Sequence, residues 1–90
     1  MTPNIVILHP RDNVAVVLAA IAALETVAAH DGETITALDD IPASHKIARV
    51  DIATGAEIIK YGEIVAVSTR EIRRGEWVHT HNLEGKVWKR

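Results

Sequence analysis

The chain is 90 residues long, carries a formal net charge of −2 at pH 7 and contains no cysteine. A chain of this length makes one domain, so we expect a single unit over residues 1–90 that ends in a basic tail at 86–90. Without cysteine, disulfides and thiolate metal sites are excluded. Acidic and basic residues are mixed along the chain, without the basic patch that nucleic-acid binding usually requires. No nucleic-acid partner is therefore predicted.

The long apolar stretch near the N-terminus does not predict a membrane span. Residues 14–29 are apolar but too few and too rich in alanine to cross a bilayer, and Glu25 interrupts them. The N-terminus also lacks the charged-then-apolar pattern of a secretory signal. We therefore expect a cytoplasmic protein that has no membrane partner.

The composition predicts a mainly β fold. Hydrophobic residues make up 48% of the chain, aromatic residues only 3%, and Phe is absent. The core must consequently consist of Ile, Val, Leu and Ala, of which the β-branched residues favour strands. A chain this short buries a modest fraction of its surface, so association with a partner subunit, or a homo-oligomer, is expected to stabilise it.

The first third of the chain begins with a predicted strand. Residues 4–8 are aliphatic and largely β-branched, and they stop before Pro10, which cannot donate a ladder hydrogen bond. A turn is expected over residues 11–13. Residues 14–29 leave two interpretations open: their alanines favour a helix, whereas the alternation of Val14, Val16 and Leu18 favours a strand that begins at Val14.

A seven-residue repeat favours the strand. An Ile, a turn residue and a second Ile or Val recur three residues apart in Ile41-x-x-Ser44-x-x-Ile47, Ile52-x-x-Gly55-x-x-Ile58, Ile72-x-x-Gly75-x-x-Val78 and, faintly, Ile21-x-x-Leu24-x-x-Val27. An acidic residue precedes the first Ile of each clear copy: Asp40, Asp51 and Glu71. The pattern predicts two strands around a tight turn with positive φ, with the aliphatic residues pointing inward.

The rest of the chain predicts short strands joined by turns at intervals of about ten residues. We expect a turn at 29–33, strands at 34–38 and 46–51, a hairpin of 57–60 and 64–68 around Tyr61-Gly62-Glu63, and a last strand at 77–83. The predicted fold class is therefore mainly β, a small barrel-like domain with at most one short helix.

His79-x-His81 is the most suggestive spacing for chemistry. In a strand, residues two apart project to the same face, about 7 Å apart, and Trp77 would lie on that face too. His79 and His81 are therefore candidate metal ligands if a third ligand comes from elsewhere. The alternative is an exposed end strand that happens to carry two polar residues, and the spacing alone does not decide.

Two cationic segments are the other candidates. His45-Lys46 follows a turn at Pro42, where Lys46 can hold a carboxylate and His45 can carry a proton. Lys60-Tyr61 offers a cation and a phenol at a hairpin tip. Each segment also has an ordinary structural explanation, a solvated turn in the first case and a packed hairpin tip in the second, which the residues alone favour.

Taken together, the motifs resemble one known family. They are His9-Pro10-x-Asp12-Asn13, Ile41-Pro42-x-x-His45-Lys46-Ile47-Ala48, Asp51-Ile52-x-x-Gly55, Lys60-Tyr61-Gly62 and Val78-His79-x-His81-Asn82-Leu83. Over nearly the whole chain they resemble the small subunit, or N-terminal domain, of the altronate and galactarate dehydratase family, with an ending more similar to the altronate branch. The resemblance implies a SAF-type domain with a β-clip fold. Ser44 stands where the family usually has Gly, which predicts a changed local geometry.

The resemblance implies a non-autonomous subunit of a hydro-lyase. Family members remove water from a sugar acid and depend on a divalent metal such as iron or manganese, and a large partner subunit is expected to hold the metal and most of the machinery. Such an elimination requires a base, an acid or metal for the leaving hydroxyl, and cations for the carboxylate. By motif match, the expected catalytic residues are His45, His79 and His81, and the expected substrate-binding residues are Lys46, Lys60, Tyr61 and Asn82.

Other functions stay open on the sequence. The sulfolactate sulfo-lyase small subunit resembles the same set of proteins, and a SAF-type domain can also bind an anion or a sugar acid without catalysis. A third alternative is a structural domain that self-associates through its apolar N-terminal stretch.

Overall fold

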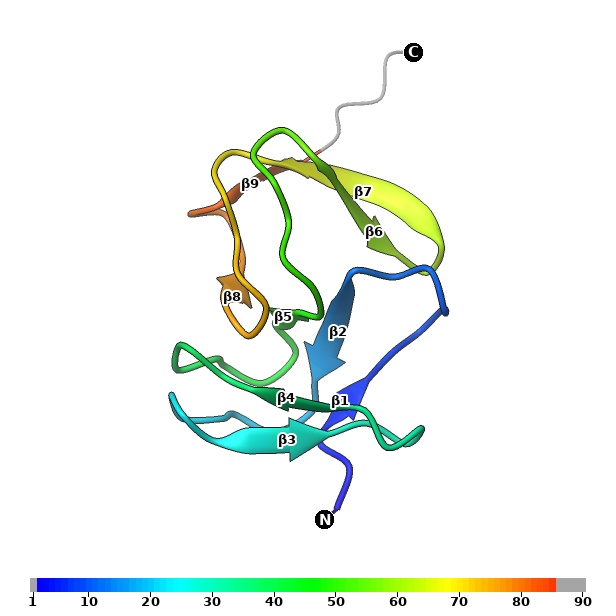
Figure 1. The fold of residues 1–90 in the computed structure, drawn as a ribbon, viewed down its shortest axis with the longest axis vertical. Coiled ribbons are helices and arrows are strands. Elements are labelled where there is room, and N and C mark those ends of the chain that lie inside the picture. Colours follow the sequence, from blue (N-terminus) through cyan, green and yellow to red (C-terminus); the bar gives the residue numbers. More distant parts are fainter. Residues whose placement is uncertain (1, 86–90) are drawn as a thin grey trace.

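The computed structural model describes residues 2–85, and all regular secondary structure in this part of the chain is β. The strands are β1 (Ile5–Val6), β2 (Val14–Val17), β3 (Thr26–Ala28), β4 (Thr34–Thr36), β5 (Lys46–Ala48), β6 (Glu57–Lys60), β7 (Glu63–Ser68), β8 (Trp77–Val78) and β9 (Leu83–Gly85). A central sheet, β1-β2-β5-β8, lies between the β3–β4 hairpin and the β6-β7-β9 sheet (Figure 1). The mainly β fold class is confirmed. Within the described residues there is no helix long and apolar enough to cross a membrane.

The central sheet brings distant parts of the chain together. All of its pairings are antiparallel, with Ala15 opposite Ile47 and Ile47 opposite Trp77. Because successive side chains in a strand point to opposite faces, the fully buried Ile47 shares a face with Trp77. Lys46 shares the other face with Val78, its partner on β8. The edge strand β8 therefore carries one side chain on each face of the sheet.

The four copies of the repeat share one turn conformation and pair in twos. Isolated bridges join the buried first residues of the copies, Ile21 with Ile41 and Ile52 with Ile72. The turn residues all have positive φ: 73° at Leu24, 69° at Ser44, 79° at Gly55 and 94° at Gly75. The strand interpretation of residues 14–29 is thus confirmed and the helical alternative is wrong. The expected change of geometry at Ser44 is also wrong, because Ser44 adopts the left-handed conformation itself.

The turn residue of each copy makes the same kind of backbone hydrogen bond. Its backbone N–H donates to a carbonyl of a neighbouring segment, from Ser44 to Val17 at 2.7 Å and from Gly75 to Ala48 at 2.9 Å. At Gly75 the backbone approach is so close that a Cβ would lie 2.3 Å from the carbonyl oxygen of Thr36. Glycine is therefore required there, whereas Ser44 bears only the cost of the left-handed backbone, about 1–2 kcal/mol.

The acidic residues before the repeats include two that join paired turns. Asp40 accepts a hydrogen bond from the backbone N–H of Ala23, and Asp51 accepts one from Arg74, each at 2.8 Å. In both cases the carboxylate belongs to one copy and the N–H to the copy paired with it. The fold therefore accounts for these two positions without any chemical role.

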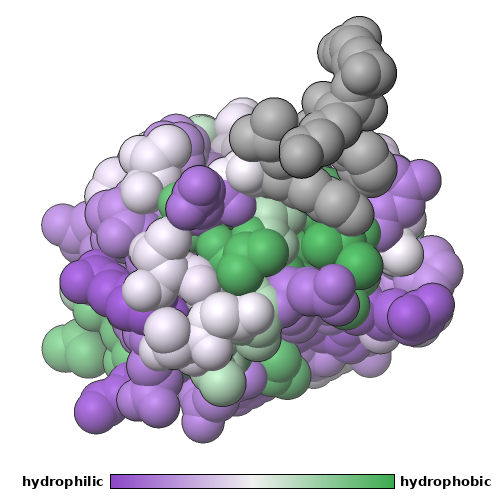
Figure 2. Space-filling model, turned by 90° about the horizontal axis from the view of Figure 1, so that it is seen from above, coloured by the Kyte–Doolittle hydropathy of each residue, from purple (hydrophilic) through white to green (hydrophobic). Residues whose placement is uncertain are grey.

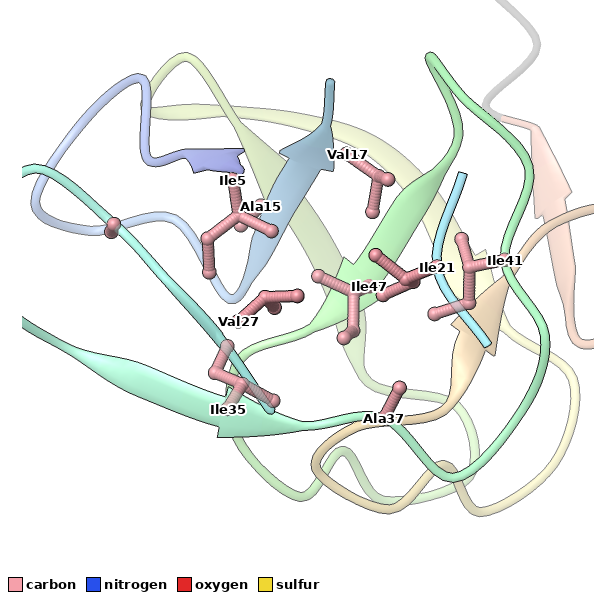
Figure 3. Close-up of a cluster of buried hydrophobic side chains, with 10 residues drawn as sticks. Ile5, Ala15, Val17, Ile21, Val27, Ile35, Ala37, Ile41 and Ile47 are labelled. Atoms are coloured by element: carbon pink, nitrogen blue, oxygen red, sulfur yellow. The ribbon is translucent and has the colours of Figure 1, made fainter. Parts of the chain in front are cut away.

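Buried aliphatic residues form two clusters, one on each face of the central sheet. The first packs against the β3–β4 hairpin, and Figure 3 shows Ile21, Ile41 and Ile47 converging within it. The second, which contains Ile58 and Ile72, packs against the β6–β7 hairpin. Full burial of each large aliphatic side chain is worth about 1.5–3 kcal/mol, so the clusters hold the three sheets together. As expected for a chain without Phe, the buried core consists of isoleucine, valine and alanine.

The N-terminal motif fastens the β6–β7 hairpin to the central sheet. The two carboxylate oxygens of Asp12, a residue only 4% exposed, accept the backbone N–H groups of Tyr61 at 3.0 Å and Gly62 at 2.8 Å. The amide of Asn13 bonds to the backbone of β6 through both its oxygen and its nitrogen, at 2.8 Å each. Successive N–H groups in a left-handed turn form a concavity that suits an anion. Asp12 fills that concavity from within the molecule.

The end of the described chain differs from the prediction. The strand expected over residues 77–83 is two strands, β8 and β9, separated by a turn at residues 79–82. The strands expected at 4–8, 34–38 and 46–51 are present but shorter. The predicted basic tail at 86–90 lies outside the described residues.

Exposed hydrophobic side chains are spread over several elements. Among residues 2–85 the most exposed is Leu24 at 79%, in the first repeat turn, followed by Tyr61 at 65%, at the β6–β7 tip. Figure 2 looks onto the end of the molecule formed by the β6-β7-β9 sheet and shows separate hydrophobic groups among hydrophilic ones. Self-association through an apolar surface therefore stays a prediction.

Candidate functional site

Four rings meet beside the edge strand β8, and we define them as the imidazole–indole cluster: His45, Trp77, His79 and His81. The ring of Trp77 lies 5.6 Å from that of His45, 5.6 Å from that of His79 and 4.9 Å from that of His81, measured between centroids. The rings of His45 and His79 are 4.5 Å apart. The fold therefore brings the three histidines of the predicted site together around one indole. Their catalytic role stays a prediction.

The pairing of β5 with β8 places His45 in the cluster. His45 follows the left-handed turn at Ser44 and precedes β5, in which Ile47 lies opposite Trp77. Residues two apart in an extended chain share a face, so His45 projects toward the side of the sheet that carries Trp77. The indole Nε1 donates a hydrogen bond to Nδ1 of His45 at 3.0 Å.

His79 and His81 enter the cluster through a turn. The backbone N–H of Asn82 donates to the carbonyl of His79 at 3.0 Å and closes the turn. The fully buried side chain of Asn82 accepts from the N–H of His79 at 3.0 Å and donates to the carbonyl of Trp77 at 2.8 Å. The strand geometry expected for His79-x-His81 is therefore wrong, although both rings reach the same indole. Asn82, expected at the substrate, has its amide engaged in shaping this turn.

The groups around the cluster are basic side chains. Partial burial lowers the pKa of His79, and the nearby charges of His45, Lys46 and His81 lower it further. Burial also lowers the pKa of Lys46, with a further contribution from the charge of Lys60. Neither lysine forms an ion pair within residues 2–85. Within residues 2–85 the carboxylate of Asp39 accepts the backbone N–H of Trp77 and forms no ion pair with either lysine, which leaves the lysines suited to an anionic ligand.

The two lysines approach one another on the face of the sheet opposite Ile47. Lys46 points to that face from β5, and Lys60 ends β6, which packs over it. The side chain of Tyr61 extends into solvent, while its backbone N–H is bonded to Asp12. The predicted substrate-binding residues are therefore not one group: Lys46 lies on the other face of β5, from which its charge still acts on His79, and Tyr61 stands at the hairpin tip.

The part of the chain that the structure describes does not contain a complete metal site. No three of its His, Cys, Asp or Glu side chains are arranged to hold a metal ion. Nδ1 of His45 is engaged with the indole N–H. Any iron or manganese would therefore need ligands from elsewhere, with His79 and His81 as the candidates from this chain.

Sequence reasoning gave no role to two residues that organise the site. Trp77 was expected only to lie on the same strand face as His79 and His81, although its two-residue spacing from His79 already pointed to a shared environment. Asp12 was part of the N-terminal family motif only, and its role at the Tyr61-Gly62 turn was not foreseen. A carboxylate that must bond a turn distant in sequence leaves no local pattern.

Comparisons with known proteins identify relatives of this chain. The chain matches the family model described as the altronate/galactarate dehydratase SAF domain over residues 3–86. It is 43% identical to the altronate dehydratase of Escherichia coli (strain K12) over 75 residues, which cover 83% of this chain and 15% of that protein. It is 36% identical to the galactarate dehydratase (L-threo-forming) of the same organism over 70 residues, which cover 78% of this chain and 13% of that protein. It is 39% identical to the (2R)-sulfolactate sulfo-lyase subunit alpha of Paracoccus pantotrophus over 54 residues, which cover 60% of this chain and 81% of that subunit.

Proposed function

Since the chain belongs to the SAF-domain family of altronate and galactarate dehydratases, we propose that it is the small subunit of an altronate-type sugar-acid dehydratase. The observation that carries the proposal is the imidazole–indole cluster, together with Lys46, whose charge acts on His79 and which forms no ion pair within residues 2–85. A larger catalytic partner completes the site. This division is supported by the two dehydratases, because the matched region makes up only 15% of the altronate dehydratase and 13% of the galactarate dehydratase. Most of each of those proteins lies outside it.

The cationic surroundings suit the first requirement of such a reaction, which is to hold a carboxylate. Lys46 and Lys60 attract the carboxylate of the sugar acid, and the absence of an ion pair on either lysine among the described residues leaves them available. His79 is suited to accept a proton, because its lowered pKa favours the neutral imidazole. The partner supplies the remaining groups and holds the predicted divalent metal, iron or manganese.

The experiment that tests this function is purification of the tagged chain from its native cells. Mass spectrometry of the eluate is expected to identify a stoichiometric larger protein, and the complex is expected to convert altronate to a 2-keto-3-deoxy acid while the isolated chain does not. Recovery of the chain alone, together with binding of a sugar acid by the isolated chain, would instead favour a binding module without catalysis.

A second candidate is the small subunit of a sulfolactate sulfo-lyase. The observation in its favour is that the match covers 81% of the Paracoccus pantotrophus alpha subunit, a much larger share than for either dehydratase. The purified complex should therefore also be offered (2R)-sulfolactate, with release of sulfite as the readout. Turnover of sulfolactate without turnover of altronate would assign this second function.

A further inference from the structure

The hydrogen bond between Trp77 and His45 has one possible direction. The indole Nε1 lies 3.0 Å from Nδ1 of His45, and an indole nitrogen only donates. Nδ1 of His45 must therefore accept the bond, so it carries no proton. A neutral imidazole has one N–H, which in His45 then belongs to Nε2.

We propose that Trp77 is a positioning residue that holds His45 as the Nε2–H tautomer. His45 then presents a hydrogen-bond donor to the ligand and keeps no free lone pair. The identity of that ligand, a sugar-acid anion, rests on the proposed function. A neutral imidazole that donates to a substrate oxygen is an established way to polarise that oxygen. The tasks of accepting the substrate proton and of ligating a metal fall to other groups.

The backbone of Trp77 is bonded on both sides, which fixes the position of the indole. Its N–H donates to the carboxylate of Asp39 at 3.0 Å, and its carbonyl accepts from the side chain of Asn82 at 2.8 Å. The ring packs against the first core cluster and stacks on His79 with 6° between the ring planes. A side chain held by packing and by hydrogen bonds is preorganised. The indole N–H is therefore held in place to donate to Nδ1 of His45.

The tautomer can be read directly in the full chain by long-range ¹H–¹⁵N NMR on protein labelled at histidine. The His45 signals are assigned by their loss in His45→Gln. Wild-type protein is expected to show an unprotonated Nδ1 and a protonated Nε2. Trp77→Phe keeps an aromatic ring and removes the donor, so the ratio of Nε2–H to Nδ1–H tautomer is expected to fall about tenfold, the effect of one hydrogen bond.

Two results would overturn the proposal: a wild-type His45 protonated at Nδ1, or a tautomer ratio that Trp77→Phe leaves unchanged. Tyr61→Phe, at the exposed hairpin tip, is the matched aromatic control and should leave the His45 signals in place. If Trp77→Phe does not fold, the wild-type protein decides through the scalar coupling between the indole N–H and Nδ1 of His45. Absence of that coupling would refute the bond.

The failure of this inference can be distinguished from failure of the proposed function, because the tautomer is measured without substrate. In the assembled complex, Trp77→Phe is expected to lower kcat for altronate about tenfold. An unchanged kcat with a relaxed tautomer would remove the positioning role. A wild-type complex that dehydrates no sugar acid would remove the proposed function and leave the tautomer assignment standing.

Discussion

Replacing Asp12 by Ala should detach the β6–β7 hairpin from the central sheet. Each carboxylate oxygen accepts one backbone N–H, from Tyr61 at 3.0 Å and from Gly62 at 2.8 Å. A hydrogen bond to a charged group contributes about 1.5–3 kcal/mol. Since the hairpin tip is exposed, water replaces part of what is lost, and the lower end of the range applies to both bonds. We expect Asp12→Ala to lower the free energy of unfolding by about 3 kcal/mol.

The size of this loss makes it easy to measure. Small domains have unfolding free energies of about 5–15 kcal/mol, so the variant should keep its fold with a much reduced margin. Each 1 kcal/mol moves the melting temperature of a domain of this size by about 4–8 °C. Thermal and urea unfolding, followed by circular dichroism, give both quantities, and amide hydrogen exchange should show lost protection at Tyr61 and Gly62.

The matched control is Asp31→Ala. Asp31 is exposed and accepts a single hydrogen bond, at 2.9 Å, from Glu33 within its own turn, so its loss should cost less than about 1 kcal/mol. The reasoning is refuted if the unfolding free energy of Asp12→Ala lies within about 0.5 kcal/mol of the wild-type value, or if Asp12→Ala costs no more than Asp31→Ala. The hydrogen bonds of Asp12 to Tyr61 and Gly62 would then not stabilise the domain.

Three further predictions concern the turns and the cluster. Gly55→Ala should lower the free energy of unfolding by about 1–2 kcal/mol, through its left-handed backbone alone. Gly75→Ala should lower it by at least about 2 kcal/mol more, because between these two sites only at Gly75 would a Cβ meet a backbone carbonyl. Equal urea midpoints for the two variants would contradict this. Leu24→Gly should leave the free energy of unfolding almost unchanged, since relief of the left-handed backbone offsets the entropy of glycine. Leu18→Gly, at an exposed site without positive φ, should lower it by about 1 kcal/mol. Similar losses for both variants would speak against strain at Leu24. Since folding lowers the pKa of His79 below 6.5, its stabilising contribution is present above pH 6.5 and is lost as the pH falls through the lowered value. The unfolding free energy of His79→Gln should therefore fall less steeply below pH 6.5 than that of the wild type, and parallel profiles would disprove the shift.

Much of the fold could be predicted because the repeat specifies the conformation of its turn and the inward direction of its aliphatic residues. The Ile-x-x-Gly-x-x-Ile pattern specifies two inward-facing residues around a left-handed turn, and the structure confirms this at Gly55 and Gly75. The faint copy at Leu24 was harder, since alanine and leucine favour helix. There the bridge from Ile21 to Ile41 and the packing beneath it override local preference.

The site was less predictable, because its geometry depends on pairing between distant segments. Alternation in Trp77, His79 and His81 is compatible with a strand, but the buried amide of Asn82 bonds the backbone on either side of Val78 and bends the chain into a turn. The bond between Trp77 and His45 requires the register of β5 on β8. No local pattern encodes that register.

We propose that this chain contributes the imidazole–indole cluster to a sugar-acid dehydratase. The most direct test is the rate of altronate dehydration by the purified complex containing His45→Ala, with His30→Ala as the control, because His30 is exposed in the turn between β3 and β4. The account predicts that kcat falls at least about a hundredfold for His45→Ala, with normal assembly, and is unchanged for His30→Ala. A His45→Ala complex that assembles and turns altronate over at the wild-type rate would contradict it.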